Sequence, residues 1–272
     1  MSRFTQALVC LLAALPATAQ SQRFAKITIQ PARSADAGNT RMQVLPNGDL
    51  IAHGVSLVVL LSYAYDVPSN PSPRLSSVPD WGIVERYDIE GKAPTGALRL
   101  RDGDSHGLVQ QMVRGLLADR FHLVLRTENK AMAAYALTVA SGGPRLETSA
   151  ISEKDCIFDT GPQGCHNFAG GLGHPLKANA IDMDDLAQYI ENWTDLPVAN
   201  RTGLRGLFST DTEGWLPMRL PPPPPDAAPD PSHFAGLPTI FTVLGKLGLE
   251  LHRQEETLPQ YTIEHVERPA AN

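Results

Sequence analysis

Alternating apolar and polar positions predict β-strands at the start of the chain. Residues 24–30 alternate in this way, which is typical of a strand with one buried face. Two further runs, 41–45 and 49–53, flank Asn47-Gly48, and Asn-Gly between two such runs indicates a β-hairpin. Another strand is expected over residues 83–91.

Apolar residues at helical spacing predict two helices in the same region. The first covers 57–65, with Ser56 as its N-cap, and the second covers 107–119. Strands at 121–126 and 135–139 follow the second helix, and a short charged turn is expected between them.

The second half of the chain repeats this plan. At an offset of 126 residues similar side chains coincide from a strand into the first helix: Leu50/Leu176, Ala52/Ala178, Val55/Ile181, Ser56/Asp182, Leu57/Met183, Leu60/Leu186 and Tyr63/Tyr189. At an offset of 128 the second helix and its strand coincide: Met112/Ile240, Val113/Phe241, Leu116/Leu244 and Leu123/Leu251. The alternative is chance agreement between two generic helix–strand patterns.

The expected fold is therefore α+β, with a first repeat over 20–150 and a second over 151–272. Each repeat would be a small, mostly antiparallel sheet with two helices on one face. The second repeat is expected to carry a Pro-rich loop, 217–232, whose five consecutive prolines, 221–225, favour an exposed polyproline II segment.

The N-terminus has the pattern of a signal peptide. Arg3 precedes an apolar run over 7–15, Pro16 breaks that run, and Ala17-Thr18-Ala19 forms a cleavage site. We expect a signal peptide over 1–19, a mature start at Gln20, and a periplasmic or secreted protein without a further membrane span. The alternative is an uncleaved N-terminal anchor.

Composition narrows the classes of partner. The chain is 42% hydrophobic with a formal charge of −6, as in an ordinary soluble globular protein. Lys and Arg form no cluster of the kind that binds phosphates, so we expect no nucleic-acid partner.

Cys156 and Cys165 are the two cysteines outside the signal peptide. In an oxidising compartment an even pair in a Gly-rich stretch predicts a disulfide. The alternative is a metal site with His166 and His174, but the cysteine spacing does not suit zinc. We therefore expect no metal and no cofactor.

One motif suggests catalysis. Ser105 lies in Gly103-Asp104-Ser105-His106-Gly107, which matches the nucleophile elbow of serine hydrolases and follows an expected strand over 97–101. The remaining pattern lacks alternating strands and helices, and the second repeat has no matching serine. Asp104-Ser105 is also explained as a helix cap, so a secreted esterase-like hydrolase is the alternative function.

Other polar and aromatic residues have structural explanations beside functional ones. Three acids, Asp182, Asp184 and Asp185, could hold Ca²⁺, but favourable charge at a helix N-terminus explains them equally. Trp81 and Trp215, beside loops, and Arg120, at a helix-to-strand corner, form a candidate interaction surface. The alternative places the tryptophans in the ends of the core and Arg120 in a structural pair with Asp119.

Several stretches carry a family resemblance. They are 24–27, 60–65, Trp81, 86–89, 116–123, 135–137, 201–204, 240–242, 247–249 and 267–269. On these the chain resembles the Solibacter-type family of uncharacterised soil-bacterial proteins, a domain of unknown function. The resemblance implies an extracytoplasmic sensory or partner-binding role, because some relatives join the domain to a membrane metallopeptidase of the antibiotic-sensing type. This chain lacks that part, so the role would be exercised in trans.

Each repeat is also similar in pattern to the short periplasmic domains of secretins and TonB-dependent receptors, which bind protein partners. We therefore expect an exported binding or sensing module, with an unknown protein or envelope ligand, rather than an enzyme.

Overall fold

A computed structural model describes residues 23–33, 40–45, 47–69, 72–95, 105–156, 164–171, 173–219 and 234–272. These residues form a mixed α/β structure with three four-stranded sheets and five α-helices. The expected signal peptide, the strand expected at 97–101 and most of the Pro-rich loop lie outside the described residues.

The first sheet has the strand order β1-β5-β3-β2 and is antiparallel throughout. Its strands are β1 (Lys26–Pro31), β2 (Arg41–Val44), β3 (Leu50–Val55) and β5 (Tyr87–Lys92). β2 pairs with β3 from Arg41↔His53 to Val44↔Leu50, which confirms the predicted hairpin. The Asn47 side chain accepts a hydrogen bond from the Asp49 amide and stabilises the turn.

Two helices cover this sheet, α1 (Leu57–Tyr65) and α3 (Ser105–Arg120), and their apolar faces build the first core. Ser56 occupies the N-cap position of α1, but its hydroxyl makes no capping hydrogen bond. A short helix, α2 (Asp80–Val84), takes the start of the strand expected at 83–91. We call the first sheet with α1, α2 and α3 the N-lobe.

The second sheet has the order β7-β11-β9-β8. Its strands are β7 (Glu147–Thr148), β8 (Ala169–Gly171), β9 (His174–Ile181) and β11 (Phe208–Asp211). It packs with α4 (Met183–Glu191) and α5 (Ile240–Lys246) around a second core, and we call this unit the C-lobe. A 3-10 turn, η2, covers Glu153–Asp155. β7 belongs to the C-lobe although it precedes residue 150, the boundary expected from sequence.

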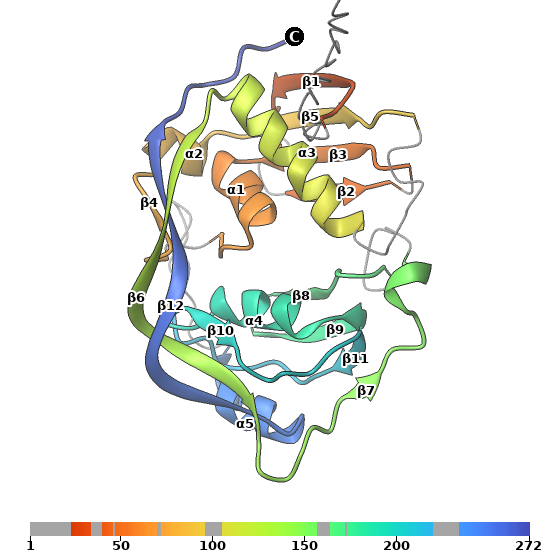
Figure 1. Cartoon of the computed structure of the whole chain (residues 1–272), viewed down its shortest axis with the longest axis vertical. Coiled ribbons are helices and arrows are strands. Elements are labelled where there is room, and N and C mark those ends of the chain that lie inside the picture. Colours follow the sequence, from red (N-terminus) through yellow and green to blue (C-terminus); the bar gives the residue numbers. More distant parts are fainter. Residues whose placement is uncertain are drawn as a thin grey trace, which may run out of the picture.

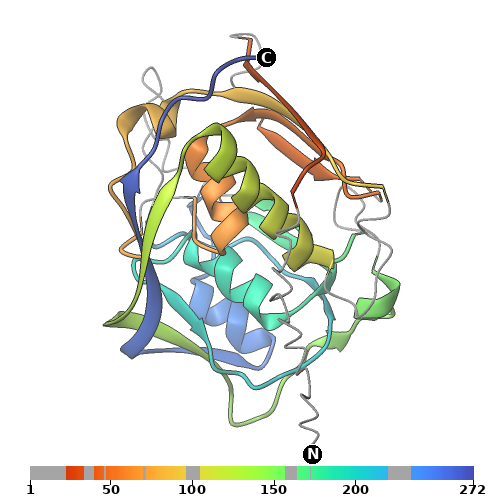
Figure 2. The ribbon, with the colours of Figure 1, turned by 45° about the horizontal axis from the view of Figure 1, so that its top comes forward.

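The third sheet links the lobes. Two long strands, β6 (Val124–Val139) and β12 (Leu249–His265), pair antiparallel along almost their whole length. Two short parallel strands complete the sheet: β4 (Leu75–Ser76) on β12, and β10 (Val198–Asn200) on β6. Figure 1 shows this β6–β12 ribbon running along one side of both lobes, and Figure 2 shows it from a second direction.

The ribbon corrects one expectation. Residues 121–126 and 135–139 were predicted as two strands with a charged turn between them, but residues 124–139 form one strand. Residues 126–130 contain no Gly or Pro that would favour a turn. Their backbone continues the strand, and their exposed side chains project from the ribbon. The two lobes therefore share this third sheet, in addition to the sheet that each has of its own.

Helices α1 and α4 have matching bounds. α1 spans 57–65 and α4 spans 183–191, so both ends differ by the offset of 126 found in the sequence. Each follows a strand, β3 or β9, that is the third in the order of its own sheet. Within the described residues, no helix has both the length and the apolar character that a membrane span requires.

Candidate functional site

A cavity of about 620 Å³ lies between the two lobes, and we call it the central cavity. Its walls come from β2 and α1 of the N-lobe and from α4 and the segment 165–170 of the C-lobe. An adjoining cavity of about 680 Å³, the acidic cavity, lies toward α3, β10 and the ribbon. The two cavities share four lining residues: Asp66, His166, Asp185 and Gln188.

The helices contribute to the central cavity in matched pairs. Four positions of the segment 59–66 line it, and so do the four positions 126 residues later: Val59/Asp185, Ser62/Gln188, Tyr63/Tyr189 and Asp66/Asn192. The matched residues have different chemistry, since three of the pairs are not identical. The cavity thus has similar geometry on both sides but an uneven distribution of charge.

Hydrogen bonds hold these walls in place. The Gln188 side chain donates a hydrogen bond through Nε2 to the Ser62 carbonyl oxygen, at 3.3 Å. From α3, the buried Gln110 side chain donates to the Tyr63 carbonyl oxygen and to Asp66 Oδ1. The cavity walls therefore consist of helices fixed by contacts within and between the lobes.

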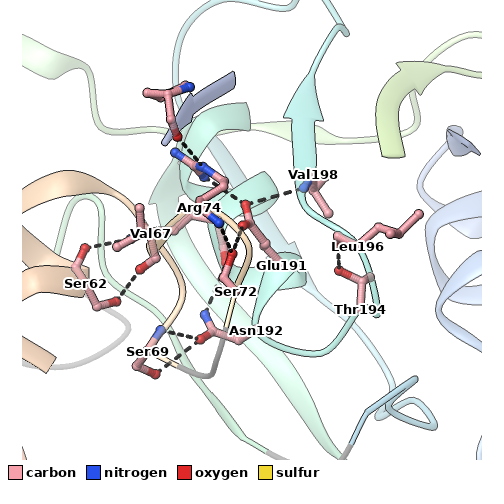
Figure 3. Close-up of polar contacts among 12 residues, drawn as sticks. Ser62, Val67, Ser69, Ser72, Arg74, Glu191, Asn192, Thr194, Leu196 and Val198 are labelled. Atoms are coloured by element: carbon pink, nitrogen blue, oxygen red, sulfur yellow. Dashed lines mark hydrogen bonds and ion pairs between the residues drawn. The ribbon is translucent and has the colours of Figure 1, made fainter. Parts of the chain in front are cut away.

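A buried ion pair joins the lobes at the edge of the acidic cavity (Figure 3). Arg74 Nη1 lies 2.9 Å from Glu191 Oε2, and the two side chains are 9% and 1% exposed. Glu191 also accepts hydrogen bonds from the Ser72 hydroxyl and the Val198 amide. Burial raises the pKa of Glu191, and the charge and hydrogen bond of Arg74 oppose that rise.

A second contact lies beside this pair in Figure 3. The side-chain oxygen of Asn192 accepts hydrogen bonds from the amide and the hydroxyl of Ser69. The loop that carries Ser69 and Arg74 is thereby attached to the C-terminal end of α4. No local pattern in the sequence marks these four residues, because the partners in each pair lie more than a hundred positions apart.

A histidine–carboxylate cluster lies at the N-terminal end of α4. His166 Nδ1 lies 2.8 Å from Asp185 Oδ2, and His166 Nε2 lies 3.1 Å from Glu153 Oε2. Burial lowers the pKa of His166, but the hydrogen bond and charge of Asp185, supported by Glu153, outweigh it and raise the pKa to about 9. His166 thus joins the segment after η2 to the start of α4.

The acids at the start of α4 form a helix cap. Asp182 accepts hydrogen bonds from the Asp184 and Asp185 amides, and Asp185 accepts one from the Asp182 amide, which completes a capping box. Burial and then the charge of Asp185 raise the pKa of Asp182 to about 6. Ligand atoms of His166, Asp182 and Asp185 lie within 4.8 Å of one another, so these three could hold a cation.

The structure places the two cysteines together. Cys156 and Cys165 form a disulfide with their Cα atoms 5.5 Å apart, as expected from sequence. Cys165 is buried beside Ala180 of β9, so the bridge ties the segment after η2 to the second sheet. His174, the other metal ligand considered with the cysteines, begins β9.

Trp81 and Arg120 contact the C-terminal segment of the chain. The Arg268 guanidinium lies 5.2 Å from the centre of the Trp81 ring and pairs with Glu85. Arg120 donates hydrogen bonds to the carbonyl oxygens of Ile27 and Ala270. These two residues therefore hold residues 266–272 against the N-lobe.

The remaining candidates lie elsewhere. Trp215 is 4% exposed and packs in the second core against Tyr189. Ser105 is the first residue of α3, and its side chain lies outside the described part of the structure. Four residues considered from the sequence as metal ligands line the acidic cavity: His166, Asp182, Asp184 and Asp185. The rest of the lining was missed, although the match of Tyr63 with Tyr189 at the offset of 126 was a signal that pointed to the central cavity.

Comparison with known protein families places most of the chain in a family. A family model described as "Protein of unknown function (DUF3738)" matches residues 58–266. No curated protein and no solved structure matches the chain.

Proposed function

We propose that this chain, which belongs to the DUF3738 family of proteins of unknown function, is an extracytoplasmic binding or sensing module that holds its ligand between its lobes. The observation that carries the proposal is the central cavity, which opens between the lobes and adjoins a second cavity of similar size. Concave sites between structural units, with a few polar groups among apolar walls, are where proteins commonly bind small ligands and peptides.

We further infer that the two lobes are copies of one ancestral unit. Support comes from the equal bounds of α1 and α4 at an offset of 126, and from the corresponding strand orders of the first two sheets. Duplication explains why matched residues line both sides of the cavity. It also fits the proposed likeness of each copy to the short domains of secretins and TonB-dependent receptors, which we suggest as a fold analogy.

The proposed location follows from the N-terminal sequence. A basic residue, an apolar run and an A-x-A site over 1–19 support export, and the disulfide fits an oxidising compartment. The resemblance to Solibacter-type proteins suggests a partner in the membrane, such as a metallopeptidase of the antibiotic-sensing type, contacted in trans. Protein recovered from the periplasm or medium should begin at Gln20, and a fraction retaining Met1 in the cytoplasm would contradict export.

The binding proposal is tested by filling the cavity. Val59 lines the central cavity, so Val59→Trp should block it, whereas Val84→Trp, at a 68% exposed position outside it, is the matched control. The probes are short peptides of basic, acidic and apolar composition, cell-wall glycopeptide fragments and fatty acids, and the readout is the shift in thermal unfolding temperature. Any probe that binds the native protein but not the unfolded chain raises that temperature.

At least one class of probe should raise the unfolding temperature of the wild type and of the Val84→Trp protein but not that of the Val59→Trp protein. A shift of equal size in the Val59→Trp protein would place the ligand elsewhere. Failure of every class to shift the wild type would contradict a binding function for the cavity.

A further inference from the structure

Two strand edges face the central cavity. β2 is the last strand of the first sheet and β8 is the last strand of the second, and in Figure 1 these are the strands at which the sheets approach each other. Met42 and Val44 of β2 and Gly170 of β8 line the cavity. Among the described residues, no strand pairs with the outer edge of either one. An edge strand directs alternate amide and carbonyl groups outward, where they can pair with another strand.

We propose that the ligand of this site is an extended peptide segment bearing basic side chains, which adds as a strand in the central cavity along β2 and β8. The inference rests on the proposed function and names the ligand class for it. Strand addition uses main-chain hydrogen bonds for affinity and pockets beneath alternate side chains for specificity. A segment that paired with both edges would join the first and second sheets.

The helices beneath the edges offer a suitable floor. Val59, Tyr63 and Tyr189 line the cavity, and Phe168, which precedes β8, packs on Tyr189 with ring centres 4.6 Å apart. Gly170 lets β8 lie directly against Tyr189, because a Cβ at this position would clash with Tyr189 Oη. Since successive side chains of a strand point to opposite faces, every second side chain of the bound segment would contact this floor.

The charge of the walls selects the side chains. Six carboxylates line the acidic cavity: Asp66, Glu153, Asp182, Asp184, Asp185 and Glu191. Only three basic side chains accompany them, and Arg74 and His166 are already paired with carboxylates. Asp66 and Asp185 also line the central cavity, together with His166, which pairs with Asp185. These three side chains leave one net negative charge on the floor beneath the strand edges. A cleft of one sign of charge concentrates ligands of the opposite sign.

The test uses a capped peptide of alternating lysine and valine, about eight residues long, which matches a typical strand. Three comparison probes separate the contributions of the sign of charge, of main-chain hydrogen bonds and of charge alone. One has glutamate in place of lysine, one carries N-methyl groups on alternate amides, and the third is spermine, which has charge without a peptide backbone. Isothermal titration measures each affinity for the full-length mature protein.

The lysine–valine peptide should bind, and N-methylation should weaken it about tenfold or more because it removes several main-chain hydrogen bonds. The glutamate peptide should not bind measurably. Equal affinity for the N-methylated peptide or for spermine would overturn strand addition, since charge alone would then explain binding.

A variant locates the charge contact. Asp66 adopts a left-handed backbone conformation with φ of 49°, which asparagine tolerates, so Asp66→Asn should fold normally. Asp66→Asn should lower the affinity for the lysine–valine peptide several-fold. Glu90→Gln, on the exposed face of β5, should leave that affinity unchanged. An unchanged affinity in Asp66→Asn would contradict the assigned ligand class.

The inference and the proposed function can fail separately. If the lysine–valine peptide does not bind but another probe class stabilises the wild type and not Val59→Trp, the cavity binds ligands and the peptide inference is wrong. If neither occurs, both are wrong.

Discussion

Arg74 and Glu191 form an ion pair with almost no contact with solvent, and they come from opposite lobes. Arg74 is also anchored to the ribbon, because its carbonyl oxygen accepts a hydrogen bond from the Tyr261 amide. The pair therefore joins three parts of the molecule, namely the N-lobe loop, the ribbon and α4. Charges in such a position are costly to bury and much more costly to leave without a partner.

Removing one partner of this pair should destabilise the protein strongly. We expect Arg74→Ala to lower the free energy of unfolding by about 3–5 kcal/mol, because it leaves Glu191 buried and unpaired. The double variant Arg74→Met/Glu191→Leu should recover most of that loss, since apolar side chains of similar size remove both charges. Urea denaturation measures all three proteins. A double variant no more stable than Arg74→Ala would show that the cost does not come from leaving a buried charge without its partner.

Stability should fall as the pH rises from 6.5 to 9. The pKa of His166 is raised from its ordinary value of 6.5 to about 9, so the folded state binds a proton more tightly than the unfolded state. The stabilisation is complete below pH 6.5 and is lost as the pH passes 9, on the order of 3 kcal/mol in total. Denaturation curves across this range should show the slope in the wild type.

His166→Gln should remove that slope, and His252→Gln, which changes an exposed histidine of β12, should retain it. The raised pKa of Asp182, about 6, acts in the same direction at lower pH, because the folded state again holds the proton more tightly. A wild-type protein whose stability rises between pH 6.5 and 9 would contradict the His166 assignment.

The disulfide should contribute to stability through the loop that it closes. Cys156 and Cys165 are nine positions apart, and a loop of this length predicts a loss of about 2–3 kcal/mol when the bridge is removed. We expect this loss in the double Cys156→Ser/Cys165→Ser variant and in the reduced wild type. Equal losses of stability in the double variant and in the reduced wild type would assign the effect to the disulfide. An unchanged denaturation midpoint when the wild type is reduced would argue against it.

Gly170 should tolerate no side chain. Its Cβ would lie 2.1 Å from Tyr189 Oη, so Gly170→Ala should cost about 1–3 kcal/mol through a forced shift of β8 or Tyr189. Adding Tyr189→Phe removes the clashing oxygen and should recover part of the loss. Gly245→Ala is the control, because a Cβ there meets nothing within 4 Å and alanine favours the helix. Thermal unfolding compares the four proteins.

Local elements were predictable from local patterns. The hairpin of β2 and β3 was recognisable because Asn47-Gly48 lies between two strand-like runs, and both α1 and α3 were recognisable from their apolar stripes. The offset of 126 was likewise visible, because a repeat requires only that two stretches resemble each other.

Features that depend on distant pairing were not predictable. Residues 126–130 are charged or polar and show no apolar alternation, and the pairing with β12 is what makes them part of a strand. Arg74 lies in a Pro/Ser-rich loop, and nothing near it indicates a partner in α4. From the sequence Trp215 could belong to an interaction surface or to the end of the core, and only the fold shows that it is buried against Tyr189. In each case the deciding contact joins segments that only the tertiary fold brings together.

The ribbon has a consequence for synthesis. β6 leaves the ribosome long before β12, its partner strand. The pairs run from Val139↔Leu249 to Val124↔His265, so more than a hundred residues separate the partners. Until then a strand of 16 residues has only the short β10 as a neighbour, and an unpaired edge of that length invites aggregation. Closing so large a loop is slow. β12 therefore completes the structure of both lobes, and we expect a nascent chain that still lacks β12 to be prone to aggregation.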